Sequence, residues 1–435
     1  MNYKDTLEYL FAQLPMFHRI GAAAYKANLD NTHAICKFLD HPENKFRSVH
    51  IAGTNGKGST SHMLAAILQS AGYKTGLYTS PHLIDFRERI RINGEMIPEK
   101  IVISFVEKYR EQFEKIKPSF FEWTVGLAFD YFANEKVEIA VIETGLGGRL
   151  DSTNVIVPEL SVITNIGWDH ANLLGDSLIK IANEKAGIIK QNIPVVIGEV
   201  QAETAQVFSD KAFEMNAPIV FAEILLQSQG KDSGDSNQQC FDIFSGKHLL
   251  FENLLLDLPG LYQRKNIITV IETVLKLREA GYSIEDKHIR EGLSAVRNLT
   301  GLMGRWQILS NAPFTICDVG HNEDGIREVL NQLTLTPHDD LHFVFGVVND
   351  KDISSILSLL PVNIKYYFCK ANLPRALDAI ELKNKAAGFG LNGLAYNSVA
   401  EAFHAAKTNA QEKDLIFIGG STFVVAEVLQ VIAEI

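Results

Sequence analysis

"SVHIAGTNGKGSTSHMLAAILQSAG" (residues 48–72) decides the fold of this chain. Residues 48–53 are a short β-branched run that predicts a strand, and residues 59–72 have the apolar spacing of a helix. Ser59 or Thr60 would cap this helix and Gly72 would end it. A second strand is predicted at 74–80. Strand, glycine-rich loop, helix and strand together form a βαβ unit, the context that a phosphate-binding loop requires.

The loop inside this unit departs from the usual phosphate-loop pattern, G-x-x-x-x-G-K-[ST]. Ile51 stands where the first glycine belongs, and Gly58 separates Lys57 from Ser59. One interpretation is a tight strand-to-helix turn with a solvent-exposed lysine. The other is a variant nucleotide loop, in which the amides of residues 54–58 surround phosphate oxygens at a helix start. Lys57 would then add a positive charge and Ser59 a hydroxyl for Mg²⁺. The loop alone leaves both interpretations open.

The rest of the chain alternates strands and helices, which predicts a mostly parallel sheet covered on both faces. In the N-terminal part, strands are predicted at 137–143, 160–164 and 194–198, and helices at 120–134, 177–190, 263–281 and 285–297. Residues 226–239 are polar and rich in Gly and Ser, which predicts a surface loop. A second series of strands follows residue 303, at 314–319, 341–348, 364–369 and 414–419. We therefore expect a domain over residues 1–298 and a smaller α/β domain over 299–435.

Composition excludes several classes of protein. The net charge of −11 argues against broad nucleic-acid binding. No apolar run approaches the roughly 20 residues of a membrane span, and the N-terminus does not resemble a signal peptide. The four cysteines are scattered, which suits reduced thiols. We expect a cytoplasmic protein with no nucleic-acid or membrane partner.

Polar side chains follow two of the predicted strands. Glu143 ends the strand 137–143, and Asp169 and His170 come soon after the strand 160–164. The carboxyl ends of parallel strands meet at one edge of a sheet, where Glu143, His170 and a serine hydroxyl could hold Mg²⁺. Arg149 and Asp151 belong to a glycine-rich stretch behind Glu143 that lets a ligand approach the backbone. The alternative is that Glu143 is solvated and His170 structural.

Lys185 lies on the apolar stripe of the predicted helix 177–190, together with Ile181 and Ala182, whereas Lys180 and Lys190 fall off that stripe and should be solvated. A lysine on a packed face must be paired, neutral or chemically modified. A neutral amine can react with CO₂ to give a carbamate, an oxygen anion suited to Mg²⁺. The alternative is an aliphatic stem that covers the core while its ammonium reaches solvent.

Several motifs occur together and in order: "HIAGTNGKGST", "YTSPHLIDFRERI" (78–90), "ETGLGGRLDSTN" (143–154), "ITNIGWDHANLLGDSLIKIANEKAGIIK" (163–190), "GRWQ" (304–307), "DVGHN" (318–322) and "GVVNDKD" (346–352). With them the chain resembles, over roughly residues 48–425, the bacterial folylpolyglutamate synthase/dihydrofolate synthase family of the Mur ligase superfamily. The shortened G-T-N-G-K loop is that superfamily's own variant. The resemblance implies a P-loop-type ATPase domain with a mostly parallel sheet, followed by a Rossmann-like C-terminal domain.

The resemblance also implies roles for particular residues. Lys57, His170 and Lys185 would be the catalytic residues, with Lys185 carbamylated. ATP would contact Thr54, Asn55, Gly56, Lys57, Gly58, Ser59, Asn266, Arg305 and Asp318. Two Mg²⁺ ions would use Ser59, Ser80, Glu143, His170 and Lys185. The pterin would contact Ser119, Phe120, Phe121, Glu122, Leu150, Asp151 and Ser152, and the incoming glutamate His321, Asp350 and Ser421.

The function that follows is an ATP-dependent amide ligase, acting through an acyl phosphate. It would add L-glutamate to dihydropteroate, to (tetrahydro)folate or to both, and the enzyme is expected to be a monomer. One alternative is another amino-acid ligase of the superfamily, although the early position of the loop leaves no room for a preceding UDP-binding domain. The other is a P-loop kinase, which would not need a second α/β domain.

Overall fold

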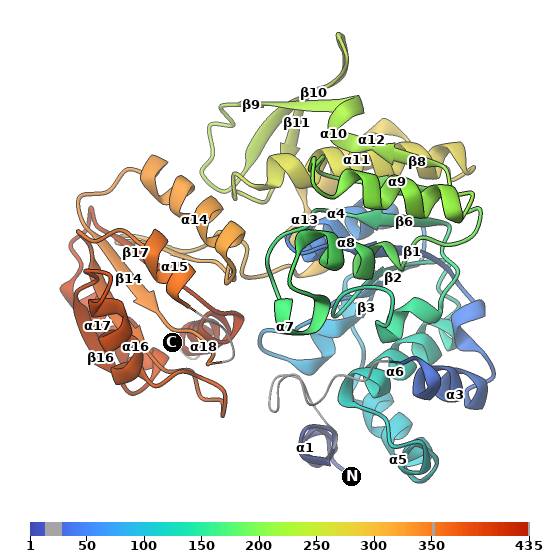
Figure 1. Ribbon diagram of the computed structural model, residues 1–435, viewed down its shortest axis with the longest axis horizontal. Coiled ribbons are helices and arrows are strands. Elements are labelled where there is room, and N and C mark those ends of the chain that lie inside the picture. The colour runs from blue at the N-terminus through green and yellow to red at the C-terminus, as the bar shows by residue number, and fades with distance from the viewer. Residues whose placement is uncertain (14–27, 350–352, 434–435) are drawn as a thin grey trace. The chain divides into compact units, whose positions relative to one another are not determined.

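The computed structural model describes residues 1–13, 28–349 and 353–433. The chain divides into two compact units. Unit 1 contains residues 1–82, 86–257 and 263–302, and unit 2 contains residues 83–85, 258–262 and 303–435. Both units are built of α-helices and mostly parallel sheets, so the predicted fold class is confirmed (Figure 1). In the described part of the chain, no helix has both the length and the apolar character needed to cross a membrane.

Unit 1 is organised by an eight-stranded sheet with the order β4-β3-β2-β5-β1-β6-β7-β8. The central strands β2, β5, β1, β6, β7 and β8 run parallel, and β3 and β4 extend one edge antiparallel. The bounds are β1 Arg47–Ala52, β2 Thr75–Tyr78, β3 Ile90–Ile92, β4 Glu95–Met96, β5 Ile139–Glu143, β6 Leu160–Ile163, β7 Val195–Ile197 and β8 Ile219–Phe221.

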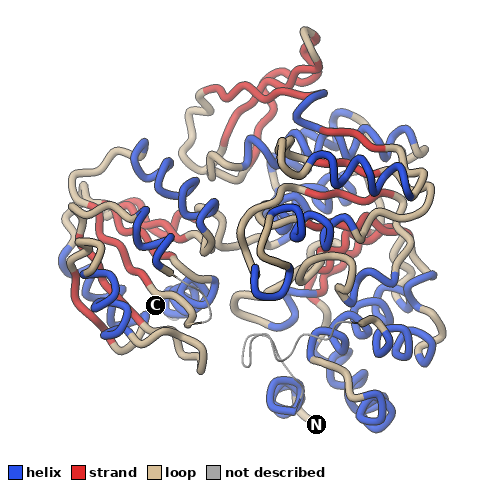
Figure 2. Tube along the Cα trace, viewed as in Figure 1, coloured by secondary structure: helices blue, strands red, loops and turns tan. Residues whose placement is uncertain are grey.

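Helices cover both faces of this sheet, because its central strands are apolar on both sides (Figure 2). On one face lie α4 (Lys57–Ser70) and α11 (Gln263–Glu279), which contact the central strands. On the other face, α6 (Phe120–Asn134) packs in one apolar core with β5 residues, and α8 (Leu178–Ala186) and α9 (Ala205–Glu214) pack in another with β6 and β7 residues.

The remaining elements of unit 1 surround this framework. The further helices are α1 (Tyr3–Gln13), α3 (Asp30–Phe38), α5 (Glu99–Ile116), α7 (Ala171–Leu174), α10 (Ala222–Leu225), α12 (Asp286–Ser294) and α13 (Val296–Thr300), with 3-10 turns η2 (Pro42–Asn44), η3 (Phe86–Arg89) and η4 (Ser152–Val155). An antiparallel sheet follows α10, with β9 (Leu226–Lys231), β10 (Gln239–Ser245) and β11 (His248–Leu256).

Three predictions about these elements were wrong in detail. The polar stretch 226–239 is not all loop, because β9 finds its hydrogen-bond partners in β10, and a partner strand can order a segment with little apolar pattern of its own. Helix α4 begins earlier than predicted, with Gly56 rather than Ser59 or Thr60 at its N-cap. The helix predicted at 285–297 is divided into α12 and α13, which meet at Ala295.

Unit 2 contains a six-stranded sheet with the order β12-β13-β17-β14-β15-β16, in which only β12 is antiparallel. The strands are β12 Gln307–Asn311, β13 Phe314–Cys317, β14 Leu341–Phe345, β15 Lys365–Cys369, β16 Gly393–Tyr396 and β17 Leu415–Gly419. The helices are α14 Glu323–Leu335, α15 Ser354–Leu359, α16 Ala379–Ala387, α17 Val399–Asn409 and α18 Thr422–Ala433. Two apolar cores, one on each side of the sheet, hold these layers together.

Candidate active site

The loop between β1 and α4 has a backbone that only glycine accommodates at two positions. Gly53 has φ +149° and Gly56 has φ +84°. A Cβ on Gly53 would lie 1.8 Å from Thr164 Oγ1, and a Cβ on Gly56 would lie 2.3 Å from Asn266 Oδ1. Both glycines therefore combine a left-handed or extended positive-φ backbone with close approach of a neighbour. The loop is a built structure rather than a chance cluster of glycines.

The segment after β6 supports this loop from the side. The backbone N–H groups of Thr54 and Asn55 donate to the carbonyl and side-chain oxygens of Asn165, each at 2.9 Å. Thr164 Oγ1 donates to the carbonyl oxygen of Asn55 at 2.6 Å, and Gly167 N–H donates to Thr54 Oγ1 at 2.9 Å. These bonds fix the entrance to α4. The first turn of a helix has no intrahelical acceptors for its N–H groups, so the start of α4 is a place that suits an anion.

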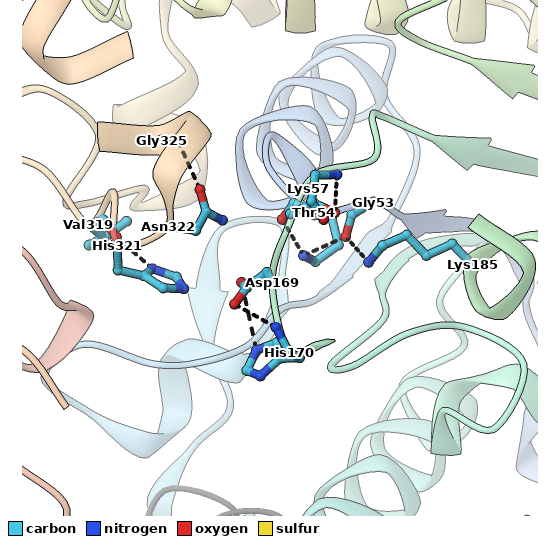
Figure 3. A network of polar contacts seen from close by, with 11 residues as sticks. Gly53, Thr54, Lys57, Asp169, His170, Lys185, Val319, His321, Asn322 and Gly325 are labelled. Atoms are coloured by element: carbon cyan, nitrogen blue, oxygen red, sulfur yellow. Dashed lines mark hydrogen bonds and ion pairs between the residues drawn. The ribbon is translucent and has the colours of Figure 1, made fainter. Parts of the chain in front are cut away.

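Two lysine side chains meet at one backbone carbonyl of the loop (Figure 3). Lys57 Nζ donates to the carbonyl oxygens of Gly53 and Thr54, each at 3.0 Å, and Lys185 Nζ donates to that of Gly53 at 2.7 Å. Lys185 is only 4% exposed, so its amine does not reach solvent as the alternative interpretation required. Burial, and next the neighbouring charge of Lys57, lowers the pKa of Lys185 to about 7. A large fraction of this amine is therefore neutral near pH 7.

The other two lysines of this region behave differently from each other. Lys180 is exposed and pairs with Asp176 at 2.8 Å, as a solvated lysine does. Lys190 was predicted to be solvated as well, and that prediction was wrong. Helix α8 ends at Ala186, so Lys190 is not on its outer face, and its Nζ donates to the Asn154 carbonyl oxygen at 2.8 Å. Burial lowers the pKa of Lys190 to about 8.

The predicted acidic residues lie after the strands that were expected to carry them. Glu143 is the last residue of β5 and is 4% exposed, and its carboxylate accepts the Ser80 backbone N–H at 3.3 Å. His170 has a left-handed backbone, φ +52°, and its Nε2 lies 3.8 Å from Asp169 Oδ2 (Figure 3). The charge of Asp169 acts on Lys185, where it opposes the lowering of the lysine pKa.

A metal set formed only from His, Cys, Asp and Glu is absent from the described ranges, where no three such side chains come together. The predicted Mg²⁺ ligands include only two residues of these types, Glu143 and His170. The remaining ligands would be the hydroxyls of Ser59 and Ser80 and a modified Lys185. These are oxygen donors with one imidazole, a set that fits Mg²⁺. The Mg²⁺ sites stay a prediction.

Gln263 joins the loop through its side chain and is not among the predicted site residues. Its Nε2 donates to Ser59 Oγ at 3.0 Å, and its Oε1 accepts a hydrogen bond from Asn266 Nδ2 at 2.7 Å. Asn266 was predicted to contact ATP, and the structure places it against Gly56 of the loop. The spacing of three between Gln263 and Asn266 puts both on one face of α11, which is the signal that could have indicated the pair.

Most of the predicted pterin-contacting residues also hold the protein structure together. Ser119 and Glu122 form a capping box at the start of α6. Asp151, 3% exposed, accepts the N–H groups of Gly145 and Leu146 with Oδ2, at 2.9 and 2.8 Å. Phe121 lies against Gly145, where a Cβ would be 2.4 Å from the ring. Of the others, Phe120 and Ser152 are buried and Leu150 is half-buried. Their contact with a pterin stays a prediction.

In unit 2, Asp318 lies directly after β13 and is 3% exposed. Its Oδ1 accepts the Gly320 N–H at 2.8 Å, and its Oδ2 accepts the Trp306 N–H at 2.7 Å and the Tyr262 hydroxyl at 2.6 Å. Burial raises the pKa of this carboxyl group, while the Tyr262 hydrogen bond and the Arg305 charge oppose that rise. Tyr262 was not predicted, because its position in the sequence is 56 residues from Asp318.

The predicted glutamate-contacting residues follow neighbouring parallel strands of unit 2. His321 follows β13 and Ser421 follows β17, and these two strands pair directly. His321 Nδ1 lies 2.9 Å from the Val319 carbonyl oxygen, and the next residue, Asn322, caps α14 by accepting the Gly325 N–H at 2.8 Å (Figure 3). Ser421 Oγ accepts the Val424 N–H at 3.2 Å. Asp350 lies outside the described residues.

Two segments of the chain match known domain families, and these matches define the class of protein. Residues 51–274 match the Mur ligase middle domain, and residues 304–422 match the Mur ligase glutamate ligase domain. The chain is thus a Mur-type ligase.

Relatives narrow this class to one family. The chain is 34% identical to the dihydrofolate synthase/folylpolyglutamate synthase of Bacillus subtilis, over 80% of this chain and 83% of the relative. Identity to the Escherichia coli protein of the same name is 33%, over 88% and 86%. The chain belongs to the dihydrofolate synthase/folylpolyglutamate synthase family of ATP-dependent glutamate ligases, which confirms the family, the fold and the ligase activity inferred from the motifs.

Solved structures agree with this assignment. Escherichia coli FolC in complex with DHPP and ADP has a TM-score of 0.85 and 29% identity, covering 100% of this chain and 98% of that one. A bifunctional folylpolyglutamate synthase/dihydrofolate synthase with Mn, AMPPNP and L-glutamate bound has a TM-score of 0.84 and 28% identity, covering 100% and 99%. Ligands of ATP type and a divalent metal are therefore present in the structures of relatives.

Proposed function

We propose that this enzyme adds L-glutamate both to dihydropteroate and to reduced folates, with ATP converted to ADP and phosphate. The observation that carries the proposal is the loop of residues 53–59, on which Lys57 and Lys185 meet at one carbonyl oxygen. The names of the relatives, which include both synthase activities, support the double substrate range.

The chemistry needs an activated carboxyl group, because a carboxylate does not react with an amine in water. Transfer of the γ-phosphoryl group of ATP to the pterin substrate's carboxylate gives an acyl phosphate. The amine of glutamate then attacks the acyl carbon, the new C–N bond forms, and phosphate leaves. Catalysis of this kind depends mainly on positioning and on neutralising charge.

The loop residues would supply the phosphate contacts. Lys57 already points into the loop, where its ammonium donates to two carbonyl oxygens. A phosphate oxygen would be a stronger acceptor than either carbonyl, because it carries charge. The N–H groups at the start of α4 would add to this site. Asn266, Arg305 and Asp318 would contact the rest of the nucleotide.

Two Mg²⁺ ions would be held by Ser59, Ser80, Glu143, His170 and the modified Lys185. When bound, Mg²⁺ neutralises phosphate charge and fixes the orientation of the transferred group. Glu143 would contribute the anionic oxygen that Mg²⁺ prefers. Glu143 is buried at the end of β5, and its carboxylate accepts the Ser80 backbone N–H. This contact supports the role, because it brings two of the proposed ligand residues next to each other.

Lys185 would be carbamylated. Its neutral amine would add to CO₂ and release one proton, giving an N-carboxy group with one N–H. That N–H can keep the 2.7 Å hydrogen bond to the Gly53 carbonyl oxygen, so the modification needs no change in the stem of the side chain. A pKa of about 7 supports the reaction, since only the neutral amine is nucleophilic.

The two parts of the chain would divide the substrates between them. Residues 1–298 would bind ATP and the pterin, the latter through residues 119–122 and 150–152. Residues 299–435 would bind the incoming glutamate, through His321, Asp350 and Ser421. The enzyme would act as a monomer in the cytoplasm.

Phosphate release tests this function directly. Release should require ATP, L-glutamate and either dihydropteroate or tetrahydrofolate, each supplied separately, and mass spectrometry should find the amide product in both cases. Activity with one pterin substrate alone would reduce the proposal to a single synthase. Phosphate transfer without glutamate and without amide formation would instead indicate a kinase.

The carbamate has its own test. Protein equilibrated with ¹³C-labelled bicarbonate should give a carbamate ¹³C signal that is absent from Lys185→Met. Lys185→Ala should be nearly inactive and partly rescued by acetate, which supplies a small carboxylate. Lys185→Arg should stay inactive, since arginine keeps the charge and cannot be carbamylated. Full activity of Lys185→Arg would contradict the modification.

A further inference from the structure

Gln263 is the first residue of α11 and is completely buried. Both polar atoms of its side chain are used: Nε2 donates to Ser59 Oγ at 3.0 Å, and Oε1 accepts from Asn266 Nδ2 at 2.7 Å. A buried amide costs free energy unless it is hydrogen-bonded, and a long glutamine side chain loses rotamer freedom when it is fixed. An apolar residue would avoid the first cost and lower the second, so the amide calls for an explanation other than packing.

The hydrogen bonds of Gln263 connect two points of the candidate phosphate loop. Asn266 donates to Gln263, and Gln263 donates to Ser59. Asn266 also lies so close to Gly56 that no Cβ fits between them. Both ends of this connection therefore contact the loop, one at its N-cap glycine and the other at its serine hydroxyl. Ser59 itself is only 1% exposed.

The consequence for Ser59 follows from its chemistry. A serine hydroxyl has one proton and two acceptor lone pairs, and it rotates among three staggered positions. Because Gln263 donates to Ser59 Oγ, one lone pair is taken and the rotation of the hydroxyl oxygen is restricted. The proton and the second lone pair share the two remaining directions around Oγ. The oxygen is therefore held in place, with a lone pair for Mg²⁺ or its proton for a phosphate oxygen.

We propose that Gln263 is a positioning residue for the nucleotide end of the reaction, which holds the Ser59 hydroxyl in the orientation that receives the ATP–Mg²⁺ complex. The inference rests on the proposed function of the loop. Groups that orient metal ligands typically account for about 10–100-fold in metal affinity or activity. The effect should appear in the dependence on ATP and Mg²⁺ and not in the dependence on the pterin substrate or glutamate.

Two variants of Gln263 remove the donor in different ways. Gln263→Leu deletes both polar atoms, and Gln263→Glu keeps an oxygen for Asn266 but loses the N–H to Ser59. Thr273→Val is the matched control: Thr273 is also fully buried on α11, and its hydroxyl donates to the Thr269 carbonyl within the same helix at 2.7 Å. Thermal unfolding of all three variants identifies any general loss of stability.

The measurements are KM for ATP, pterin and glutamate and the Mg²⁺ concentration for half-maximal activity. Both Gln263 variants should raise the KM for ATP and the half-maximal Mg²⁺ concentration about tenfold or more. The KM values for pterin and glutamate should stay within twofold of the wild type. Thr273→Val should change none of these four quantities. In a Ser59→Ala background, Gln263→Leu should add less than a twofold effect, because its target is gone.

Other outcomes overturn the inference in distinguishable ways. If Gln263→Leu lowers activity by the same factor with and without Ser59, or raises all three KM values alike, Gln263 acts through general structure and only the positioning role is lost. If Ser59→Ala leaves the ATP and Mg²⁺ dependence unchanged, the proposed function of the loop fails, and the positioning role fails with it.

Discussion

His50 makes the stability of unit 1 depend on pH, and its contribution can be worked out from the structure. The ring is completely buried in β1, with Nε2 2.8 Å from Thr153 Oγ1. Thr153 Oγ1 donates to Asp151 Oδ1 at 2.5 Å, so it accepts from the histidine, and the proton of the neutral ring is on Nε2. Nδ1 then has no hydrogen-bond partner among the described residues. A second proton on Nδ1 would be buried and unpaired.

The pKa of His50 is lowered from 6.5 to about 3, first by burial and then by the charge of Lys190. Between these two values the unfolded chain binds a proton that the folded chain does not. Unfolding is therefore favoured as the pH falls below 6.5. Each pH unit in this window is equivalent to about 1.4 kcal/mol. Because the unfolded histidine is already half protonated at pH 6.5, lowering the pH from 6.5 to 4.5 should cost unit 1 about 2.3 kcal/mol through His50 alone.

His50→Gln removes this proton-linked term while keeping an N–H near the position of Nε2. The free energy of opening should be measured from hydrogen exchange of the β1 and β5 amides at pH 4.5, 5.5 and 6.5, corrected for the intrinsic exchange rate. At pH 6.5 the variant should be about 1 kcal/mol less stable than the wild type, because its hydrogen bond is less well formed. At pH 4.5 the order should be reversed.

His33→Gln provides the control, since His33 is exposed on α3. Its stability should follow that of the wild type at every pH. If His50→Gln also follows the wild type, with a constant difference between pH 6.5 and 4.5, then His50 takes up its proton in the folded protein, and the argument from burial and tautomer is wrong.

Two further predictions concern the loop and the strand end. Lys57→Ala should abolish turnover but change the thermal midpoint little, because the side chain is half-buried and, within the described residues, donates to the loop carbonyls of Gly53 and Thr54. Near-normal turnover in a folded variant, compared with that of Lys108→Ala on α5, would reject the phosphate role. Glu143→Gln should raise the Mg²⁺ concentration needed for activity and lower the rate by orders of magnitude, because an amide is a weaker ligand than a carboxylate; a Mg²⁺ titration identical to that of the wild type would exclude Glu143 as a ligand.

The central unit of the fold could be predicted because its signals are local. Residues 48–72 contain a β-branched run, a glycine-rich turn and a helical apolar pattern, and the structure builds β1, the loop and α4 from them. The same holds for α6, whose predicted bounds are the observed ones. Helical spacing also placed Lys185 on the apolar stripe of its helix, but it left open whether the amine is buried or reaches solvent.

The predictions that were wrong concern segments without a local signal. Residues 226–239 are polar, and they become partly strand only because β10 supplies partners for β9. Lys190 was assigned to the outer face of a helix that in fact ends four residues earlier, at Ala186. Both errors arise because a pattern of single residues does not say which backbone groups will find partners elsewhere.

By itself, the sequence determined the elements that have a local pattern, such as β1 and α6, and the family whose motifs they carry, since periodicity, glycines and motifs are properties of neighbouring residues. Only the tertiary structure decided which atoms meet. Lys57 and Lys185, 128 positions apart in the sequence, share the carbonyl oxygen of Gly53. Gln263 reaches Ser59 across 204 positions. Such contacts depend on how parallel strands and their helices are ordered in space, and hydrogen bonds at this range are set by the packed fold rather than by spacing along the chain.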